Sequence, residues 1–109
     1  MIALLMRFVK LVNSARKGKR FVATFEDPKK TIHFGSKGGS TYIDHHDKSK
    51  RENYLKRHSP SGVYVPKGNY EVNENWNEVN AGSLSAFLLW GKSANLESNL
   101  IRYVKRFDL

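Results

Sequence analysis

The sequence contains no cysteine among its 109 residues. This absence excludes disulfide bonds, thiolate metal sites and thiol nucleophiles. Acidic residues are also scarce, with 10 Asp and Glu against 19 Lys and Arg, which gives a formal net charge of +9. A hydrophobic content of 39% is too high for a disordered tail. We therefore expect one small folded domain over residues 1–109, with a strongly charged surface.

The chain has no long hydrophobic run. Its amino-terminal apolar stretch, residues 1–6, ends at Arg7. It is too short to span a bilayer and lacks the basic start of a signal peptide. We interpret this apolar extension as the edge of a strand or as a surface anchor that contacts lipid or an apolar groove. The alternative is an apolar plug that inserts into a partner protein.

The positive charge is concentrated in the first two thirds of the chain. Residues 1–68 carry 15 basic and five acidic residues, whereas residues 69–109 carry four basic and five acidic ones. This asymmetry predicts a basic surface built on the first part and a near-neutral packing module behind it. It points to a polyanionic partner, either nucleic acid or an acidic protein face, and favours binding over small-molecule chemistry.

Alternating apolar and polar residues predict strands at 7–12, 20–26 and 31–34. A basic loop separates the first two segments and an Asp-Pro turn separates the next two, which favours a three-stranded antiparallel meander. After a glycine-rich stretch, residues 41–43 are expected to form a short fourth strand.

Short polar side chains mark the expected helix starts. Asp47 is predicted to cap a helix over residues 48–58, which the segment 59–62 would end. Asn80 is predicted to cap an apolar helix over residues 81–90.

Gly91 would close that second helix in the left-handed conformation. A last helix begins at Ser93 or Asn95 and carries apolar residues at helical spacing: Leu96, Leu100, Tyr103, Val104 and Phe107. Residues 63–78 are expected to form a long loop wrapped around the domain. The predicted class is α+β, with a small antiparallel sheet of three to four strands covered by two or three helices.

Two polar segments are candidate ligand sites. The glycines around Lys37 could expose backbone amides to a phosphate or carboxylate, although a tight connection between strands explains them as well. The segment Asp44-His45-His46-Asp47, with His58, has metal-ligand chemistry and suggests a metal-dependent nuclease as a minor alternative. Capping and surface hydrogen bonding explain these residues better, so we predict no metal, no cofactor and no catalytic residue.

Basic side chains are the stronger functional prediction. A solvated surface explains any single lysine, but the many cations with few nearby carboxylates favour a partner-binding surface. Tyrosines near these cations, Tyr42, Tyr54 and Tyr64, could stack on bases, although we favour core or rim packing for them. The predicted partner-binding residues are Arg16, Lys17, Lys19, Arg20, Lys29, Lys30, Lys37, Lys48, Lys50, Arg51, Lys56 and Arg57.

One pattern extends over about two thirds of the chain. It comprises the segment 31–38, then Tyr42, His45, Asp47, Arg51, Tyr54, Arg57 and His58, and later 81–85 with Leu89 and Trp90. This pattern resembles short, basic, uncharacterised proteins of large nucleocytoplasmic DNA viruses, including relatives of chlorella viruses and mimiviruses. A departure is Glu78-Val79-Asn80 where that family often has an Asn-Pro-type turn.

The resemblance implies a virion or virus-factory setting and transfers no catalytic residue. Our primary expectation is a minor capsid protein, located in the virion, that binds and cements major capsid subunits through the basic surface. The runner-up is a nucleic-acid-binding protein that packages the genome, and a metal-dependent nuclease is the third possibility.

Overall fold

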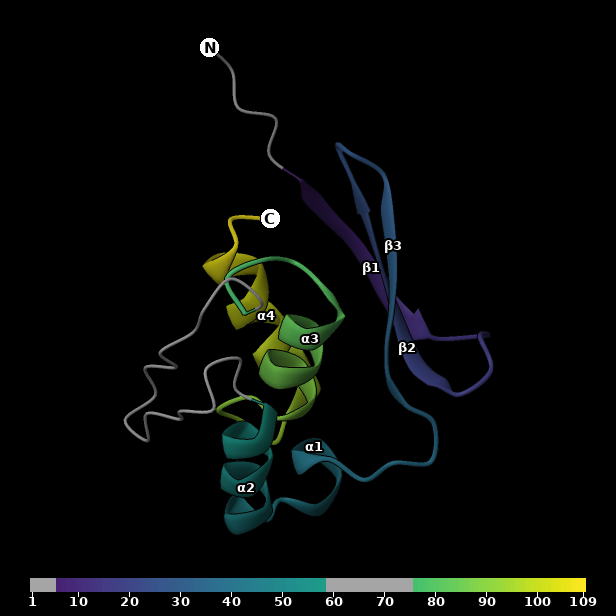
Figure 1. Cartoon of the computed structure of the whole chain (residues 1–109). Helices are drawn as coiled ribbons and strands as arrows, with labels where there is room; N and C mark the ends of the chain where they lie inside the picture. Colours follow the sequence, from purple (N-terminus) through teal and green to yellow (C-terminus); the bar gives the residue numbers. More distant parts are fainter. Residues whose placement is uncertain (1–5, 59–75) are drawn as a thin grey trace.

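The computed structural model describes residues 6–58 and 76–109. It confirms the predicted α+β class, with a three-stranded antiparallel sheet beside a group of helices (Figure 1). Several predictions fall outside the described residues: most of the apolar extension, the helix end at 59–62, Tyr64 and most of the loop at 63–78. Within the described residues, no helix is long and apolar enough to cross a membrane.

The sheet is the predicted meander. Its strands are β1 (Arg7–Asn13), β2 (Lys19–Glu26) and β3 (Lys30–Ser36), in the order β1-β2-β3 with antiparallel pairing. Phe21 pairs with Phe34 and Ala23 pairs with Ile32. These pairs follow from the apolar alternation in the sequence, because side chains two residues apart point to the same face of a strand.

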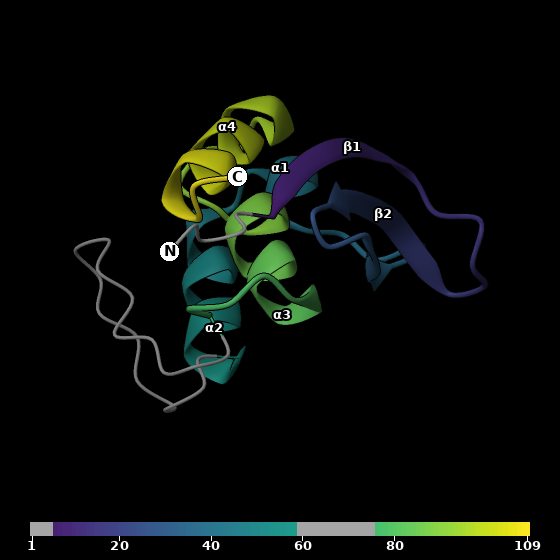
Figure 2. The same ribbon diagram turned by 90° about the horizontal axis from the view of Figure 1, so that it is seen from above.

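One face of the sheet is covered by helices. Viewed from above, the helices lie on one side of the strands (Figure 2). Ala23, Phe25, Ile32 and Phe34 are buried in the core between the two layers. The helical layer therefore packs on this apolar face of the sheet.

The expected fourth strand at 41–43 is wrong, because these residues enter the short helix α1 (Tyr42–His45). Thr41 and Asp44 form a capping box, in which the Thr41 amide donates to the Asp44 carboxylate at 2.8 Å. Two β-branched residues gave this segment strand propensity, but the reciprocal cap satisfies the free amides of a helix start.

The helix α2 (Lys48–His58) begins at the predicted residue and has the predicted cap. The Asp47 carboxylate accepts hydrogen bonds from the amides of Ser49 and Lys50 at 2.9 and 3.1 Å. Leu55 is its fully buried side chain and anchors the helix in the core.

The second predicted helix, over residues 81–90, consists of an α-helical segment followed by a π-helical segment. Asn80 caps α3 (Ala81–Leu84) by accepting from the Ser83 amide at 2.8 Å, as predicted, and a π-helical segment, η1 (Ser85–Leu89), continues from it. Four residues of η1 are buried, so this segment lies at the centre of the core.

Gly91 does not have the predicted left-handed conformation, since the positive-φ glycines of the described residues are Gly18, Gly35 and Gly38. Glycine is needed at this position because there is no room for a side chain. A Cβ at this position would lie 2.2 Å from the Phe87 carbonyl oxygen and 2.7 Å from Cγ of Asn99.

The last helix, α4 (Leu96–Arg106), starts at the Asn95 cap, which is one of the two predicted starts. Tyr103 is fully buried, and its hydroxyl lies 2.7 Å from Oγ of Ser83. Burial raises the pKa of Tyr103 to about 12. Asn99 donates to the carbonyls of Leu88 and Ser93, so buried polar groups fix α4 against η1.

Candidate interaction surface

The first group of predicted cations lies where β1 joins β2. Arg16, Lys17 and Lys19 occupy this connection, and the Lys37 amide donates to the Gly18 carbonyl at 3.1 Å. All four cationic residues are exposed, and none forms an ion pair with the described parts of the chain. The fold therefore brings Lys37, from the end of β3, to the basic loop about twenty residues earlier.

A serine and a histidine lie behind this basic loop. Ser14 Oγ is 2.7 Å from Nδ1 of His33, and it also accepts from the Arg16 amide at 3.0 Å. Desolvation and the charges of Arg16 and Lys19 lower the pKa of His33. The ring is therefore neutral at pH 7, and its Nδ1 can accept a hydrogen bond from the Ser14 hydroxyl. This hydrogen bond holds the loop against β3.

Lys29 and Lys30 lie at the opposite end of the sheet, in and beside the turn between β2 and β3 (Figure 1). Lys30 Nζ donates to the Val79 carbonyl at 3.2 Å, so it fastens the hairpin to the segment that precedes α3. Lys29 is exposed. The predicted cations are thus divided between two ends of the sheet, because consecutive antiparallel turns alternate in position. The prediction of one basic surface on the first part of the chain is wrong in this respect.

The exposed cations of α2 form a third group: Lys48, Lys50, Lys56 and Arg57. Lys56 Nζ lies 4.0 Å from a Glu52 carboxylate oxygen, in a pair that is exposed on both sides and contributes little stability. The other three make no ion pair with the described residues.

Like Lys30, two of the predicted arginines are used by the fold itself. Arg20 makes two hydrogen bonds of 2.7 Å with the Asp44 carboxylate, and these bonds are the largest cause of the lowered pKa of Asp44. Arg51 Nε donates to the carbonyls of Trp90 and Gly91 at 3.0 and 2.7 Å. We assign both arginines to positioning, Arg20 for α1 and Arg51 for α2.

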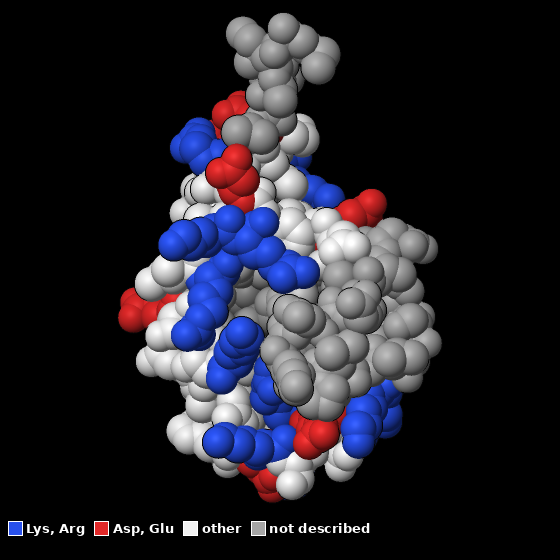
Figure 3. Space-filling model, turned by 90° about the vertical axis from the view of Figure 1, so that its left-hand side faces the viewer, with Lys and Arg blue, Asp and Glu red and all other residues white. Residues whose placement is uncertain are grey.

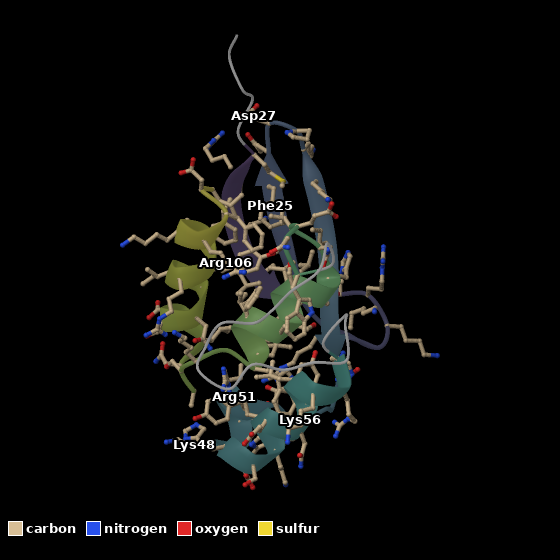
Figure 4. The ribbon with its side chains drawn as sticks, turned by 60° about the vertical axis from the view of Figure 1, so that its left-hand side comes forward. Phe25, Asp27, Lys48, Arg51, Lys56 and Arg106 are labelled. Atoms are coloured by element: carbon tan, nitrogen blue, oxygen red, sulfur yellow. The ribbon has the colours of Figure 1, made fainter. Side chains whose placement is uncertain are left out.

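A fourth basic group was missed by the sequence prediction, with two members on the carboxyl-terminal helix and one in the connection before it. Lys92, Arg102 and Arg106 line a cavity of ≈ 200 Å³ with Phe87 and Tyr103 among its walls. The Arg106 guanidinium lies 4.5 Å from the centroid of Phe87, in a cation–π contact. Figure 3 shows Lys and Arg gathered in a band over α4 and α2, and Figure 4 shows Arg106 above Arg51 and Lys48 on this side.

A sequence signal for this group exists. Four basic residues and two acidic ones occur from Lys92 to Asp108. Averaging the charge over residues 69–109 hid this surplus, because three of the five acidic residues in that stretch precede Ala81. The spacing of Arg102 and Arg106 at i and i+4 places them on one helix face.

A second cavity, with a volume of ≈ 460 Å³, lies between the end of β3, the glycine-rich connection, α2 and α3. Serine and threonine hydroxyls line it, together with Lys19, His58, Tyr54 and Trp90, and no carboxylate of the described residues does. Tyr54 stacks on Trp90 at 4.3 Å and on His58 at 4.0 Å between ring centroids. Tyr54 and the buried Tyr42 thus pack inside the domain, which is the packing role favoured for them from the sequence.

The histidines of the candidate metal site have different structural roles. His45 Nδ1 accepts from the Asp47 amide at 2.9 Å, His46 ends α1 in the left-handed conformation, and His58 Nδ1 lies 3.0 Å from the Tyr54 carbonyl. In the described ranges 6–58 and 76–109, no three His, Asp or Glu side chains are gathered in a way that could hold a metal ion.

The fold and surface together define a small α+β protein that displays cations in several exposed groups. Among known families, residues 9–58 match the model of a family of unknown function, DUF5754. This match covers the sheet from Val9 onward, α1 and α2, and includes all twelve predicted partner-binding residues. No curated protein and no solved structure matches the chain.

Proposed function

We propose that this protein is a non-enzymatic structural component of a virus particle, which holds together the acidic surfaces of neighbouring capsid subunits. The observation that supports this role is the separation of its exposed cations. Arg16, Lys17 and Lys37 lie at one end of the sheet, Lys29 lies at the other, and α2 and α4 carry further groups. Cations that face different directions suit a protein that bridges several surfaces better than one that fills a single groove.

Weak contacts are sufficient for such a role. Exposed ion pairs each contribute at most about 1 kcal/mol. A protein that touches two or more subunits converts its later contacts into intramolecular ones, so its retention on a lattice exceeds the strength of any single contact. The virus setting is what the sequence resemblance implies, and the bridging role is what the arrangement of charges supports.

Quantitative mass spectrometry of purified, fractionated particles tests this proposal. We expect a copy number in fixed proportion to a capsid subunit, and retention of the protein in shells that lack the genome. A protein that leaves the particle together with the genome core would contradict the capsid role and support the second candidate.

That second candidate is binding of the packaged nucleic acid, and the band of cations over α4 and α2 favours it (Figure 3). Because Tyr54 is already stacked between Trp90 and His58, such binding would use phosphates rather than base stacking. Fluorescence anisotropy with duplex DNA should then give a log–log salt slope of about −0.9 for each phosphate contacted. Binding that is lost at physiological salt would speak against packaging.

A further inference from the structure

We propose that the protein has a built binding site for a single phosphate group, at the cavity between α1, α2 and the end of η1. This cavity has a volume of ≈ 200 Å³ and is lined by Ser40, His45, Lys50, Asn53, Arg57 and Trp90. It is smaller than the cavities of about 300–1,000 Å³ that hold drug-sized ligands, so a compact oxyanion suits it better than a larger molecule. The site goes beyond the proposed capsid role and does not depend on it.

The charge of the cavity is one-sided. Lys50 and Arg57 are both exposed cations of α2, and Asn53 lies between them in the sequence, which places all three on adjoining turns of one helix face. No carboxylate lines the cavity among the described residues. The nearby acidic side chains are already engaged, because Asp44 pairs with Arg20 and Asp47 caps α2.

An unpaired donor supports the assignment independently of the charge. Among the described residues, Nε2 of His45 is the only buried side-chain nitrogen or oxygen atom that has no hydrogen-bond partner. The other ring nitrogen, Nδ1, accepts from the Asp47 amide, so the proton of the neutral ring is on Nε2. A buried donor without an acceptor is rare in folded proteins and calls for a specific explanation.

A phosphate oxygen would supply the missing acceptor. Trp90 is the ring neighbour of His45, with centroids 5.3 Å apart, and an indole face is only a weak acceptor. Because Nε2 is covered, side chains around it must shift before a phosphate oxygen can reach it. Phosphate would thus be held by two cations and by neutral donors on α1 and α2, and the Arg57 guanidinium can bind two of its oxygens at once.

Titration with inorganic phosphate, followed by NMR of the histidine rings and by calorimetry against chloride at equal ionic strength, tests the site. We expect saturable binding and a shift of the His45 Nε2 resonance. The double variant Lys50→Gln with Arg57→Gln should weaken binding by at least about tenfold, the change that corresponds to 1.4 kcal/mol. The matched control, Lys48→Gln with Lys56→Gln, removes the same charge from the same helix outside the cavity and should change affinity by less than about twofold.

A third variant isolates the histidine. His45→Asn keeps an acceptor near the position of Nδ1 and removes Nε2, so it should weaken phosphate binding while its unfolding curve remains cooperative. The proposal is overturned if phosphate and chloride act alike, or if the two double variants lose binding equally. It is also overturned if His45→Asn binds phosphate as the wild type does.

The source of the phosphate group is distinguished with short oligothymidylates. Tighter binding of a 5′-phosphorylated oligomer than of its unphosphorylated form identifies a terminal phosphomonoester as the ligand. Equal binding of the two oligomers at this site identifies the phosphodiester backbone. Binding of inorganic phosphate alone identifies the free ion.

Discussion

The two halves of the described chain use their cations differently. In residues 6–58, three of the predicted cations are drawn into the fold. Arg20 pairs with Asp44, Arg51 binds the carbonyls of Trp90 and Gly91, and Lys30 binds the carbonyl of Val79. In residues 76–109, which are nearly neutral as a sequence, Arg102 and Arg106 stay on the surface and line a cavity. The net charge of a sequence segment therefore predicts the charge of its surface poorly, because some cations are bound within the fold and others are exposed.

The halves also differ in what fixes them. The first half is held by strand pairing and by caps, and its buried side chains are few and separated along the sequence. The second half contributes a dense aromatic and aliphatic core over η1 and α4, with Asn99 and Ser83 buried among the apolar side chains. We therefore expect the largest losses of stability from changes in the second half.

Gly91→Ala is expected to have the largest effect, a loss of about 3 kcal/mol in the free energy of unfolding, because the added methyl group overlaps a carbonyl and the Asn99 side chain. Urea denaturation measures this loss. Gly38→Ala is the matched control, since its φ of +84° is strained but no atom lies within 4 Å of the added Cβ. It should cost about 1 kcal/mol, and equal losses in the two variants would contradict the steric explanation.

Arg51→Met should destabilise the protein by about 2 kcal/mol, because it leaves the carbonyls of Trp90 and Gly91 without their charged donor. Arg57→Met, on the same helix, should change the free energy of unfolding by no more than about 0.5 kcal/mol, since Arg57 is exposed. The same urea experiment compares both. If the two variants behaved alike, the division between positioning and displayed cations would be wrong.

Much of the fold could be predicted from local patterns. The strands followed from alternation, and the starts of α2, α3 and α4 followed from Asp47, Asn80 and Asn95, because the cap is made by atoms two or three residues away. The helix α1 was missed. Its cap carboxylate is held by Arg20, 24 residues earlier, and local propensity does not contain such a partner.

The candidate site was predictable only in its composition. The sequence indicates that Lys50 and Arg57 are exposed on a helix, but not that they border a cavity with His45 and Trp90, which come from separate elements. The need for glycine at position 91 likewise depends on Asn99, which reaches it only after α4 has packed on η1. Long-range packing, rather than local propensity, decides these features.

The Arg20–Asp44 pair should make stability fall in acid. Its hydrogen bonds lower the pKa of Asp44 in the folded state, so the folded protein holds this proton less tightly than the unfolded chain does. The contribution is complete above the unfolded pKa of about 3.9, and it is lost as the pH falls toward the folded value. Asp44→Asn should remove about 1 kcal/mol at pH 7, a figure reduced for the partial exposure of the pair.

Urea midpoints measured from pH 7 to pH 2 check this effect. The difference between the wild type and Asp44→Asn should shrink below about pH 4, where protonation removes the charge from the wild type as well. A Glu52→Gln variant is the control, because the exposed Glu52–Lys56 pair should contribute little at any pH. A difference that stayed constant down to pH 2 would assign the effect to shape rather than to charge.

The smallest expected effect concerns His33, at the basic end of the sheet. Its lowered pKa means that the folded state favours the neutral ring, so stability is complete above the unfolded pKa of about 6.5 and falls as the pH drops below it. His33→Gln should show a flatter profile between pH 7 and pH 5 than the wild type. If removing Arg16 by Arg16→Gln also flattened the profile, the charges of the loop would be a cause of the shift. An unchanged profile would exclude Arg16 and leave desolvation beside Ser14, together with the charge of Lys19, as the causes of the lowered pKa of His33.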